Sequence, residues 1–130
     1  MRAYAWIVGE QSPVGETYPI SGFCPLYHRA IEIIGRRWTG AIVRAMLAGD
    51  VRFSQVRATI PGISDRLLSQ RLKELEVEGL VERTVHDETP VRIEYHLTAK
   101  GEALGSVVQA ASQWAEHWLA RPPASQAARR

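Results

Sequence analysis

Polar side chains suited to recognition are concentrated between Gly62 and Gly79. The residues of this segment that could bind a ligand are Ser64, Asp65, Arg66, Ser69, Gln70 and Lys73, and acidic residues follow them. Arginine can bond guanine through two N–H groups, glutamine can bond adenine in a similar bidentate way, and lysine meets phosphate. These residue types indicate a segment that reads base edges in a DNA major groove by its N-terminal half. Ordinary charge pairing on a solvated surface helix is the alternative interpretation.

The same segment has the signals of an amphipathic helix. Ser64 can cap its N-terminus, and Gly79 can adopt the left-handed conformation that ends it. The apolar residues that recur at helical spacing are Leu68, Leu72 and Leu75. They predict a buried stripe on one side, which leaves the polar residues on other faces.

Two charged residues of this helix have alternative roles. Asp65 could contact DNA or could only stabilise the positive end of the helix dipole. Arg71 could also contact DNA, but an ion pair with Glu74 or Glu78 is the favoured expectation.

The elements around this helix predict a winged helix-turn-helix. Upstream helices are expected from Cys24-Pro25 to Gly35, from Arg36–Thr39 to the turn at Gly49-Asp50, and, capped by Ser54, from Gln55 to about Ile60. Pro61-Gly62 then breaks the chain before the next helix begins. Downstream, residues 80–85 and 91–97 have strand character around a turn at 86–90, which predicts a hairpin. Helix, tight turn, helix and hairpin in this order is the layout of a winged helix-turn-helix.

Arginines on the hairpin extend the predicted DNA-binding surface. Arg92, near the hairpin tip, is placed to meet a minor groove or its flanking phosphates, and Arg83 could assist it. Residues 29–57 hold six arginines against two acids, whereas half of the 14 acids fall between residues 74 and 94. This distribution favours a polyanionic partner more than the net charge of +2 does by itself.

Length and composition limit the class of protein. A chain of 130 residues with 45% hydrophobic residues suits one domain. It lacks an apolar run of about eighteen residues and a signal peptide, so we expect a cytoplasmic protein with no membrane partner. A single cysteine excludes an internal disulfide framework and a cysteine-rich zinc site. Without a phosphate-binding loop, an activated nucleophile or a carboxylate pair, we expect neither an enzyme nor a cofactor.

The last predicted helix, capped by Thr98 and ending near Ala120, has a wide apolar stripe. The residues of the stripe that we assign to a dimer interface are Leu104, Val108, Ala111, Trp114 and Trp118. A domain of this size can hardly bury two tryptophans on a projecting helix, so a second copy of the chain is the expected partner. Packing of the stripe on the N-terminal arm is the alternative. With Trp38, otherwise a core residue, these tryptophans could also wall a pocket for a small effector.

The chain divides into four predicted regions. Residues 1–22 form an irregular N-terminal arm, 23–98 the winged helix-turn-helix DNA-binding domain, 99–121 a C-terminal dimerisation helix, and 122–130 a disordered tail. The arm is apolar enough to lie against the body or a second subunit. The expected fold is mainly α with a small β-hairpin and with terminal helices that form a dimer.

Cys24 is the one residue with a candidate redox chemistry. It is expected at or next to the N-cap of the first helix, where unpaired amides and the helix dipole favour a thiolate, and His28 or Arg29 could add to this effect. A redox or electrophile sensor and a small, partly buried cap residue are equally weighted interpretations. Cys24 and His28 share a helix face, but no further ligands at suitable spacing accompany them, so no metal site is expected.

Six blocks of the sequence, in order and at compatible spacing, resemble the HxlR family of bacterial transcriptional regulators, which are winged-helix relatives of the MarR group. The blocks are CP at 24–25, IGRRWT at 34–39, RFSQVR at 52–57, IPGIS at 60–64, LSQRLKEL at 68–75 with GLV at 79–81, and EYHLTAKG at 94–101. The likeness extends over about residues 23–119. Arg37 stands where the family commonly has lysine, which keeps the charge, and the arm before Phe23 is longer than expected and has no matched motif.

The resemblance implies a dimeric DNA-binding regulator whose terminal helices form the dimer and whose helix at Ser64 enters the major groove. Some similar proteins sense oxidants or electrophiles through a cysteine at the position of Cys24, by an intersubunit disulfide or an adduct. We therefore predict a sequence-specific repressor that binds a pseudo-palindromic operator as a homodimer. Its release would follow a signal at Cys24 or a small ligand. A winged-helix protein-interaction module without DNA specificity is the alternative.

Overall fold

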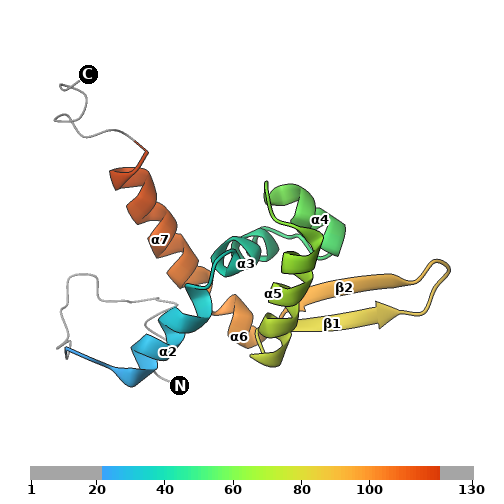
Figure 1. The fold of residues 1–130 in the computed structure, drawn as a ribbon, viewed down its shortest axis with the longest axis horizontal. Helices are drawn as coiled ribbons and strands as arrows, with labels where there is room; N and C mark the ends of the chain where they lie inside the picture. Colours follow the sequence, from blue (N-terminus) through green and yellow to red (C-terminus); the bar gives the residue numbers. More distant parts are fainter. Residues whose placement is uncertain (1–21, 121–130) are drawn as a thin grey trace.

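Six helices and one β-hairpin make up the part of the chain that the computed structural model describes, residues 22–120 (Figure 1). The helices are α2 (Pro25–Ile34), α3 (Thr39–Leu47), α4 (Phe53–Thr59), α5 (Asp65–Val77), α6 (Ala99–Glu102) and α7 (Gly105–Trp118). The strands are β1 (Val81–His86) and β2 (Arg92–Leu97). The predicted N-terminal arm, up to residue 21, and the predicted C-terminal tail lie outside the described residues.

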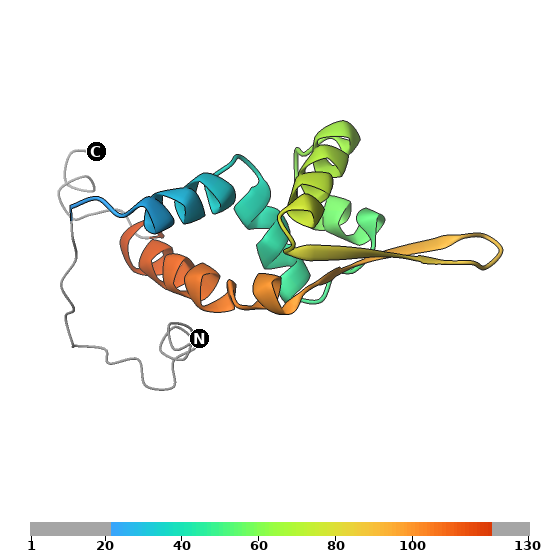
Figure 2. The same ribbon diagram turned by 90° about the horizontal axis from the view of Figure 1, so that it is seen from below.

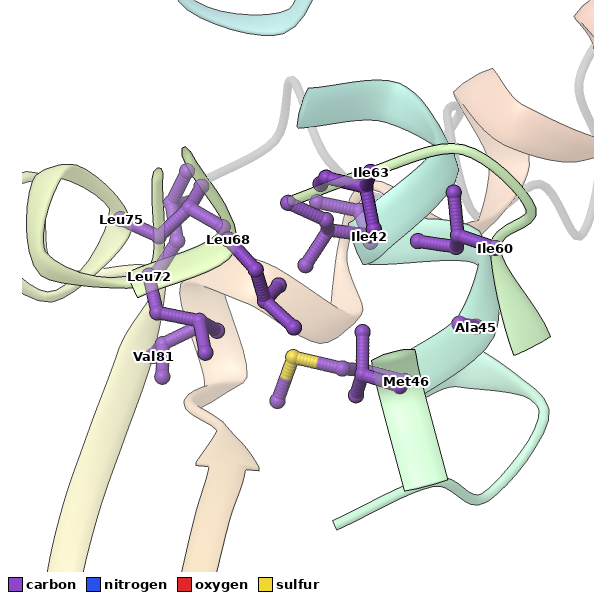
Figure 3. Close-up of a cluster of buried hydrophobic side chains, with 12 residues drawn as sticks. Ile42, Ala45, Met46, Ile60, Ile63, Leu68, Leu72, Leu75 and Val81 are labelled. Atoms are coloured by element: carbon purple, nitrogen blue, oxygen red, sulfur yellow. The ribbon is translucent and has the colours of Figure 1, made fainter. Parts of the chain in front are cut away.

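One apolar core joins α3, α4, α5 and the base of the hairpin (Figure 3). Its largest fully buried side chains are Ile42, Val43, Val56, Leu68 and Leu72. The stripe predicted on α5 is confirmed, because Leu68, Leu72 and Leu75 are between 0 and 2% exposed. Burying a leucine contributes about 1.5 to 3 kcal/mol, so these three side chains hold α5 on the body and leave its other side outside. Trp38 is partly buried and packs against this core, as predicted.

Local signals fix where α5 begins and ends. The Ser64 hydroxyl accepts a hydrogen bond from the backbone N–H of Leu67 at 3.1 Å, which is the predicted cap. Gly62, in the turn before the helix, and Gly79, just past its end, have φ angles of +90° and +80°. A side chain with a Cβ is strained in this left-handed region, so both turns depend on glycine.

The two strands pair antiparallel, from Val81 opposite Leu97 to His86 opposite Arg92. The predicted hairpin is confirmed, and each strand starts one residue later than expected. The backbone N–H of Tyr95 also donates to the carbonyl of Val51 at 2.7 Å. The segment that leads into α4 is therefore attached to the sheet.

The helix before the Pro-Gly turn begins earlier than predicted. We expected Ser54 to cap a helix from Gln55, but α4 starts at Phe53. The side-chain oxygen of Gln55 accepts hydrogen bonds from the N–H groups of Val51 and Arg52, at 2.9 and 3.0 Å. The N–H of Val56, which a Ser54 cap would have served, donates instead to the carbonyl of Arg52 at 3.1 Å, so the serine cap is not needed.

The continuous C-terminal helix predicted from Thr98 to about Ala120 is wrong, because the chain breaks it into α6 and α7. Thr98 caps α6 as expected, by accepting from the N–H of Gly101 at 3.1 Å. The N–H of Leu104 then bonds to the carbonyl of Gly101 at 3.0 Å, a tighter turn than an α-helix makes. Gly101 packs so closely on the hairpin base that an added Cβ would lie 2.2 Å from the Leu80 carbonyl oxygen. This tertiary contact fixes α6 in place.

The first and last described helices lie at the end of the molecule opposite to the hairpin tip (Figures 1 and 2). Neither α2 nor α7 has a fully buried residue. Over residues 22–120, every helix is too short or too polar to cross a membrane.

Candidate nucleic-acid interface

The helix α5 presents a continuous polar face to solvent. The predicted contact residues are all exposed, namely Ser64, Asp65, Arg66, Ser69, Gln70 and Lys73. Residues three and four positions apart are neighbours on a helix surface, so the five that follow the cap share one side. The fold therefore brings the α5 part of the predicted site together on the side opposite the buried leucines.

Three of these side chains have no partner within residues 22–120. Arg66, Ser69 and Lys73 make no hydrogen bond or ion pair with the rest of the described chain. Binding an external anion or base edge would thus break no internal interaction of these groups. They are the most available polar groups of the predicted site.

Asp65 is engaged within the chain. Its Oδ1 lies 2.7 Å from NH1 of Arg57 on α4, and Nε of Arg57 donates to the carbonyl of Ile63 at 3.3 Å. The Asp65 and Arg57 side chains are 67% and 49% exposed, so the pair adds little stability. It does orient Arg57 across the turn between the two helices, and the carboxylate also suits the first turn of α5.

Gln70 belongs to a charged network centred on Glu74. The Nε2 atom of Gln70 lies 3.3 Å from Oε2 of Glu74. The same carboxylate accepts from Arg36 at 2.9 Å and from Arg71 at 3.2 Å. Burial alone would raise the pKa of Glu74, but the hydrogen bonds from Arg36 and Gln70 and the charges of Arg71 and Arg36 lower it below its usual value. Glu74 is therefore ionised at neutral pH.

Arg71 holds the fold together and does not face solvent. Its side chain is only 13% exposed, and its Nε donates to the carbonyl of Arg37 at 2.9 Å. The predicted ion pair is confirmed with Glu74. Glu78, the other expected partner, pairs instead with Arg29 of α2 at 3.1 Å.

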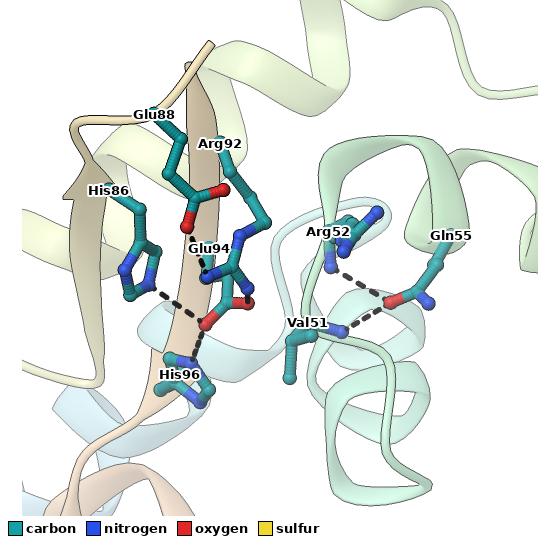
Figure 4. A network of polar contacts seen from close by, with 8 residues as sticks. All are labelled: Val51, Arg52, Gln55, His86, Glu88, Arg92, Glu94 and His96. Atoms are coloured by element: carbon teal, nitrogen blue, oxygen red, sulfur yellow. Dashed lines mark hydrogen bonds and ion pairs between the residues drawn. The ribbon is translucent and has the colours of Figure 1, made fainter. Parts of the chain in front are cut away.

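On the hairpin, Arg92 pairs with two carboxylates (Figure 4). Its NH1 lies 2.6 Å from Glu94 and its NH2 lies 3.0 Å from Glu88. The hydrogen bond to Glu88, together with the charges of both carboxylates, raises the pKa of Arg92. The predicted contact of Arg92 with DNA would compete with these pairs, so Arg92 is a weaker candidate than the unpaired Arg66.

The carboxylate of Glu94 also gathers two histidines that the sequence did not single out. Its Oε1 lies 3.0 Å from Nε2 of His96 and 3.3 Å from Nε2 of His86. Hydrogen bonds from His96 and His86 and the charge of Arg92 lower the pKa of Glu94, although burial opposes them. The signal for this cluster lay in the alternation of β2, which places residues 92, 94 and 96 on one face.

Comparison with protein families decides the identity of the domain. The sequence model of HxlR-like helix-turn-helix proteins matches residues 33–123, more than two thirds of the chain. This chain belongs to the HxlR-like helix-turn-helix family. The helix-turn-helix of this HxlR-like chain is α4, the turn at Pro61-Gly62 and α5, and the hairpin β1–β2 is its wing.

Relatives of this HxlR-like chain are helix-turn-helix regulators. Bacillus subtilis (strain 168) YvaP, named an uncharacterized HTH-type transcriptional regulator, is 50% identical over 99 residues, which cover 76% of this chain and 92% of YvaP. The HTH-type transcriptional regulator YodB of the same organism is 44% identical over 95 residues, covering 73% and 85% of the two chains. The chain is therefore a transcriptional regulator of the helix-turn-helix type, a class whose members bind DNA.

Solved structures agree with this assignment. Reduced YodB from B. subtilis superposes with a TM-score of 0.66 at 43% identity, covering 75% of this chain and 95% of that one. The redox regulator HypR in its oxidized form superposes with a TM-score of 0.69 at 34% identity, covering 77% and 100%. The mainly helical fold with a two-stranded wing is thus shared with these two regulators.

In this HxlR-like chain, Cys24 is the N-cap of α2, as predicted. Its Sγ accepts from the N–H of Tyr27 at 3.5 Å, and the residue is partly exposed. The position lies ahead of the residues that the family model matches. Within residues 22–120, no three His, Cys, Asp or Glu side chains are arranged to hold a metal ion.

The two side chains that could have assisted the thiol are paired elsewhere. His28 lies 3.5 Å from Glu32, one turn along α2. Arg29 reaches Glu78 at the C-terminal end of α5. The consequence is a direct link between α2 and the helix that carries the predicted DNA contacts.

The predicted dimer residues divide into two groups. Leu104 and Val108 are partly buried and pack against the core of their own chain. Ala111 is exposed, and the side chains of Trp114 and Trp118 are 58% and 61% exposed. With so much of their surface uncovered, these tryptophans do not wall an enclosed pocket within residues 22–120. The distal part of α7 is left as an apolar surface without cover from the described residues.

Proposed function

We propose that this chain is a sequence-specific DNA-binding repressor that binds a pseudo-palindromic operator as a homodimer. The observation that carries the proposal is the exposed face of α5, where Arg66, Ser69 and Lys73 have no partner in the described chain. With α5 in the major groove, Arg66 would bond guanine, Gln70 adenine and Lys73 phosphate. The wing, with Arg92, would lie near the adjacent minor groove.

The apolar surface of α7 supports the homodimer. Trp114 and Trp118 are large side chains on α7, and α2, which carries Leu26 and Tyr27 at 81% and 67% exposure, is a helix at the same end of the molecule as α7. Exposed apolar groups of this size are typical of an interface between subunits. A two-fold dimer with one reading helix per subunit requires half-sites about 34 Å apart or a multiple of that distance.

A redox or electrophile signal at Cys24 is the proposed means of release, and a small ligand is the other candidate. Solved structures of YodB include diamide-treated and quinone-bound forms, and HypR is described as a redox regulator. In this chain the thiol is partly exposed at the start of α2, and Arg29 joins that helix to α5. Modification that displaces α2 would therefore disturb the reading helix.

Binding to the region upstream of the gene tests the proposed activity. Fluorescence anisotropy with this fragment and with a scrambled fragment, at about 50 and about 200 mM salt, should show a preference for the natural sequence and a steep loss of affinity with salt. Light scattering coupled to gel filtration should give a dimer. Equal affinity for both fragments would instead indicate the protein-interaction module.

Oxidation of the protein tests the proposed signal. Diamide takes two electrons from two thiols and so couples Cys24 to a second thiol as a disulfide. Diamide should release the wild-type protein from the operator, and dithiothreitol should restore binding. Diamide should not change operator binding by the Cys24→Ser variant. If the fully oxidised wild-type protein remains bound to the operator, Cys24 is not the redox sensor.

A further inference from the structure

The hydrogen bond between Gln70 and Glu74 restricts the orientation of the side-chain amide that we expect to read a base. Oε2 of Glu74 lies 3.3 Å from Nε2 of Gln70. An ionised carboxylate only accepts hydrogen bonds, so the amide nitrogen, and not the amide oxygen, must face it. Gln70 is therefore held in one of the two orientations that a free glutamine amide can take.

The carboxylate itself is held by two arginines. Its Oε1 lies 2.9 Å from NH1 of Arg36, and both of its oxygens lie 3.2 Å from NH1 of Arg71. Arg71 is fixed in turn by the carbonyl of Arg37. Arg36 and Arg37 belong to the connection between α2 and α3, so contacts from outside α5 help to set the position of the carboxylate.

The orientation of Gln70 determines which base it can read. A primary amide has two N–H groups, and donating one to Glu74 leaves the carbonyl oxygen and the second N–H. Oxygen and N–H together match N6 and N7 of adenine in the major groove. A flipped amide would present its nitrogen as a donor to guanine O6 or N7, and here the carboxylate prevents that flip.

We propose that Glu74 is a positioning residue that orients Gln70 toward adenine and so fixes the base preference at one position of each half-site. The inference rests on the proposed DNA-binding function, which it deepens. Glu74 itself need not touch DNA. Its role is exerted through the amide of Gln70.

The test is a base-substitution panel of the operator, in which each position of a half-site carries each of the four bases. Competition anisotropy gives relative affinities for the wild type and for the Glu74→Ala, Gln70→Ala and Glu76→Ala variants. Glu76 is an exposed carboxylate on the same helix whose side chain has no partner in the described chain, so its variant controls for the loss of one negative charge. Thermal melts show that each variant is folded at the assay temperature.

The expected result is specific to one position. The wild type should prefer adenine there by about tenfold, within the range typical of a bidentate contact. Gln70→Ala and Glu74→Ala should reduce that preference to about twofold or less and leave the other positions unchanged. Glu76→Ala should keep the full preference.

A second substitution makes the orientation itself testable and keeps the side-chain size. In Glu74→Gln the new amide oxygen is expected to stay with the arginines, so its NH₂ group faces Gln70 and turns the Gln70 oxygen inward. The outward NH₂ of Gln70 should then favour guanine over adenine at the same position. A switch of base preference is not expected from a merely structural role of Glu74.

The outcomes separate the two proposals. If Gln70→Ala removes a preference that both Glu74 variants retain, Gln70 reads DNA without Glu74 and the positioning role is refuted. If Glu74→Ala weakens discrimination equally at all positions, its role is structural and the inference also fails. If the wild type shows no sequence preference, the proposed function fails and this inference fails with it.

Discussion

The contrast between Arg66 and Arg71 gives the sharpest test of which arginines of α5 serve DNA. Both are on the same helix, but Arg66 is exposed with no partner in the described chain, whereas Arg71 is 13% exposed and bonds Glu74 and the Arg37 carbonyl. Replacing each by alanine removes the same charge. The two variants should therefore lose different properties.

For Arg66→Ala the loss should appear in specific DNA binding. A bidentate arginine–guanine pair contributes about 1 to 3 kcal/mol, and a homodimer has two of them, so the loss should be about 2 to 6 kcal/mol, or at least about 30-fold in affinity. Its stability should stay within about 0.5 kcal/mol of wild type because no internal contact is lost. Anisotropy with natural and scrambled fragments measures the first quantity, and urea unfolding measures the second.

For Arg71→Ala the loss should appear in stability. Removing this donor leaves the Arg37 carbonyl and part of the Glu74 carboxylate unsatisfied, which costs about 1 to 3 kcal/mol. Each kcal/mol lowers the melting temperature of a domain of this size by about 4 to 8 °C. Operator affinity unchanged in Arg66→Ala, or a wild-type melting temperature in Arg71→Ala, would refute the division of roles that we draw from the contacts.

Three further predictions follow from the caps, the wing and the apolar helix. Ser64→Ala should lower the free energy of unfolding by about 1 kcal/mol, because the N–H of Leu67 loses its acceptor, and calorimetry would measure it. The pKa of Glu94 is lowered in the folded state. Its contribution to the free energy of unfolding is therefore fully present above the unfolded pKa of about 4.3 and is lost as the pH falls through the lower folded value. Glu94→Gln should therefore flatten the loss of stability as the pH falls below this unfolded value, as measured by urea midpoints. Trp114→Glu should convert the proposed dimer to a 14.5 kDa monomer in light scattering.

Each of these predictions has its own control. Ser69→Ala removes a hydroxyl without a partner in the described chain and should leave the melting temperature unchanged. An equal acid transition in wild type and Glu94→Gln would show that the wing cluster does not stabilise the fold. A wild-type protein that is itself monomeric would reject the assigned role of Trp114.

The features that sequence predicted well depend on short-range signals. The leucine stripe, the Ser64 cap and the left-handed Gly79 each depend on residue types and spacings within one helix and its ends, and the hairpin follows from alternation on both strands. The Arg71–Glu74 pair was predictable for the same reason, because the two residues are one helical turn apart.

The features that sequence did not predict depend on contacts between distant residues. The pairs of Arg29 with Glu78 and of Arg36 with Glu74 join positions far apart in the chain, and no local pattern specifies them. Arg92 is an exception, because its partners Glu88 and Glu94 are only four and two positions away and are brought to it by the hairpin turn and the shared strand face. The predicted contact residues thus lie together on the exposed side of α5, but the division between engaged and available side chains required the fold.

The contact beneath Gly101 has a consequence for the geometry of the whole regulator. A methyl group added at Gly101 would collide with the Leu80 carbonyl, so the segment between the wing and α7 is closely packed on the base of the hairpin. The direction in which α7 leaves the domain is accordingly tied to the base of the wing. In a dimer joined at the distal end of α7, the distance between the two copies of α5 would depend on the geometry of this segment. Gly101 would then help to determine the spacing of the half-sites that the dimer binds, although it does not contact DNA.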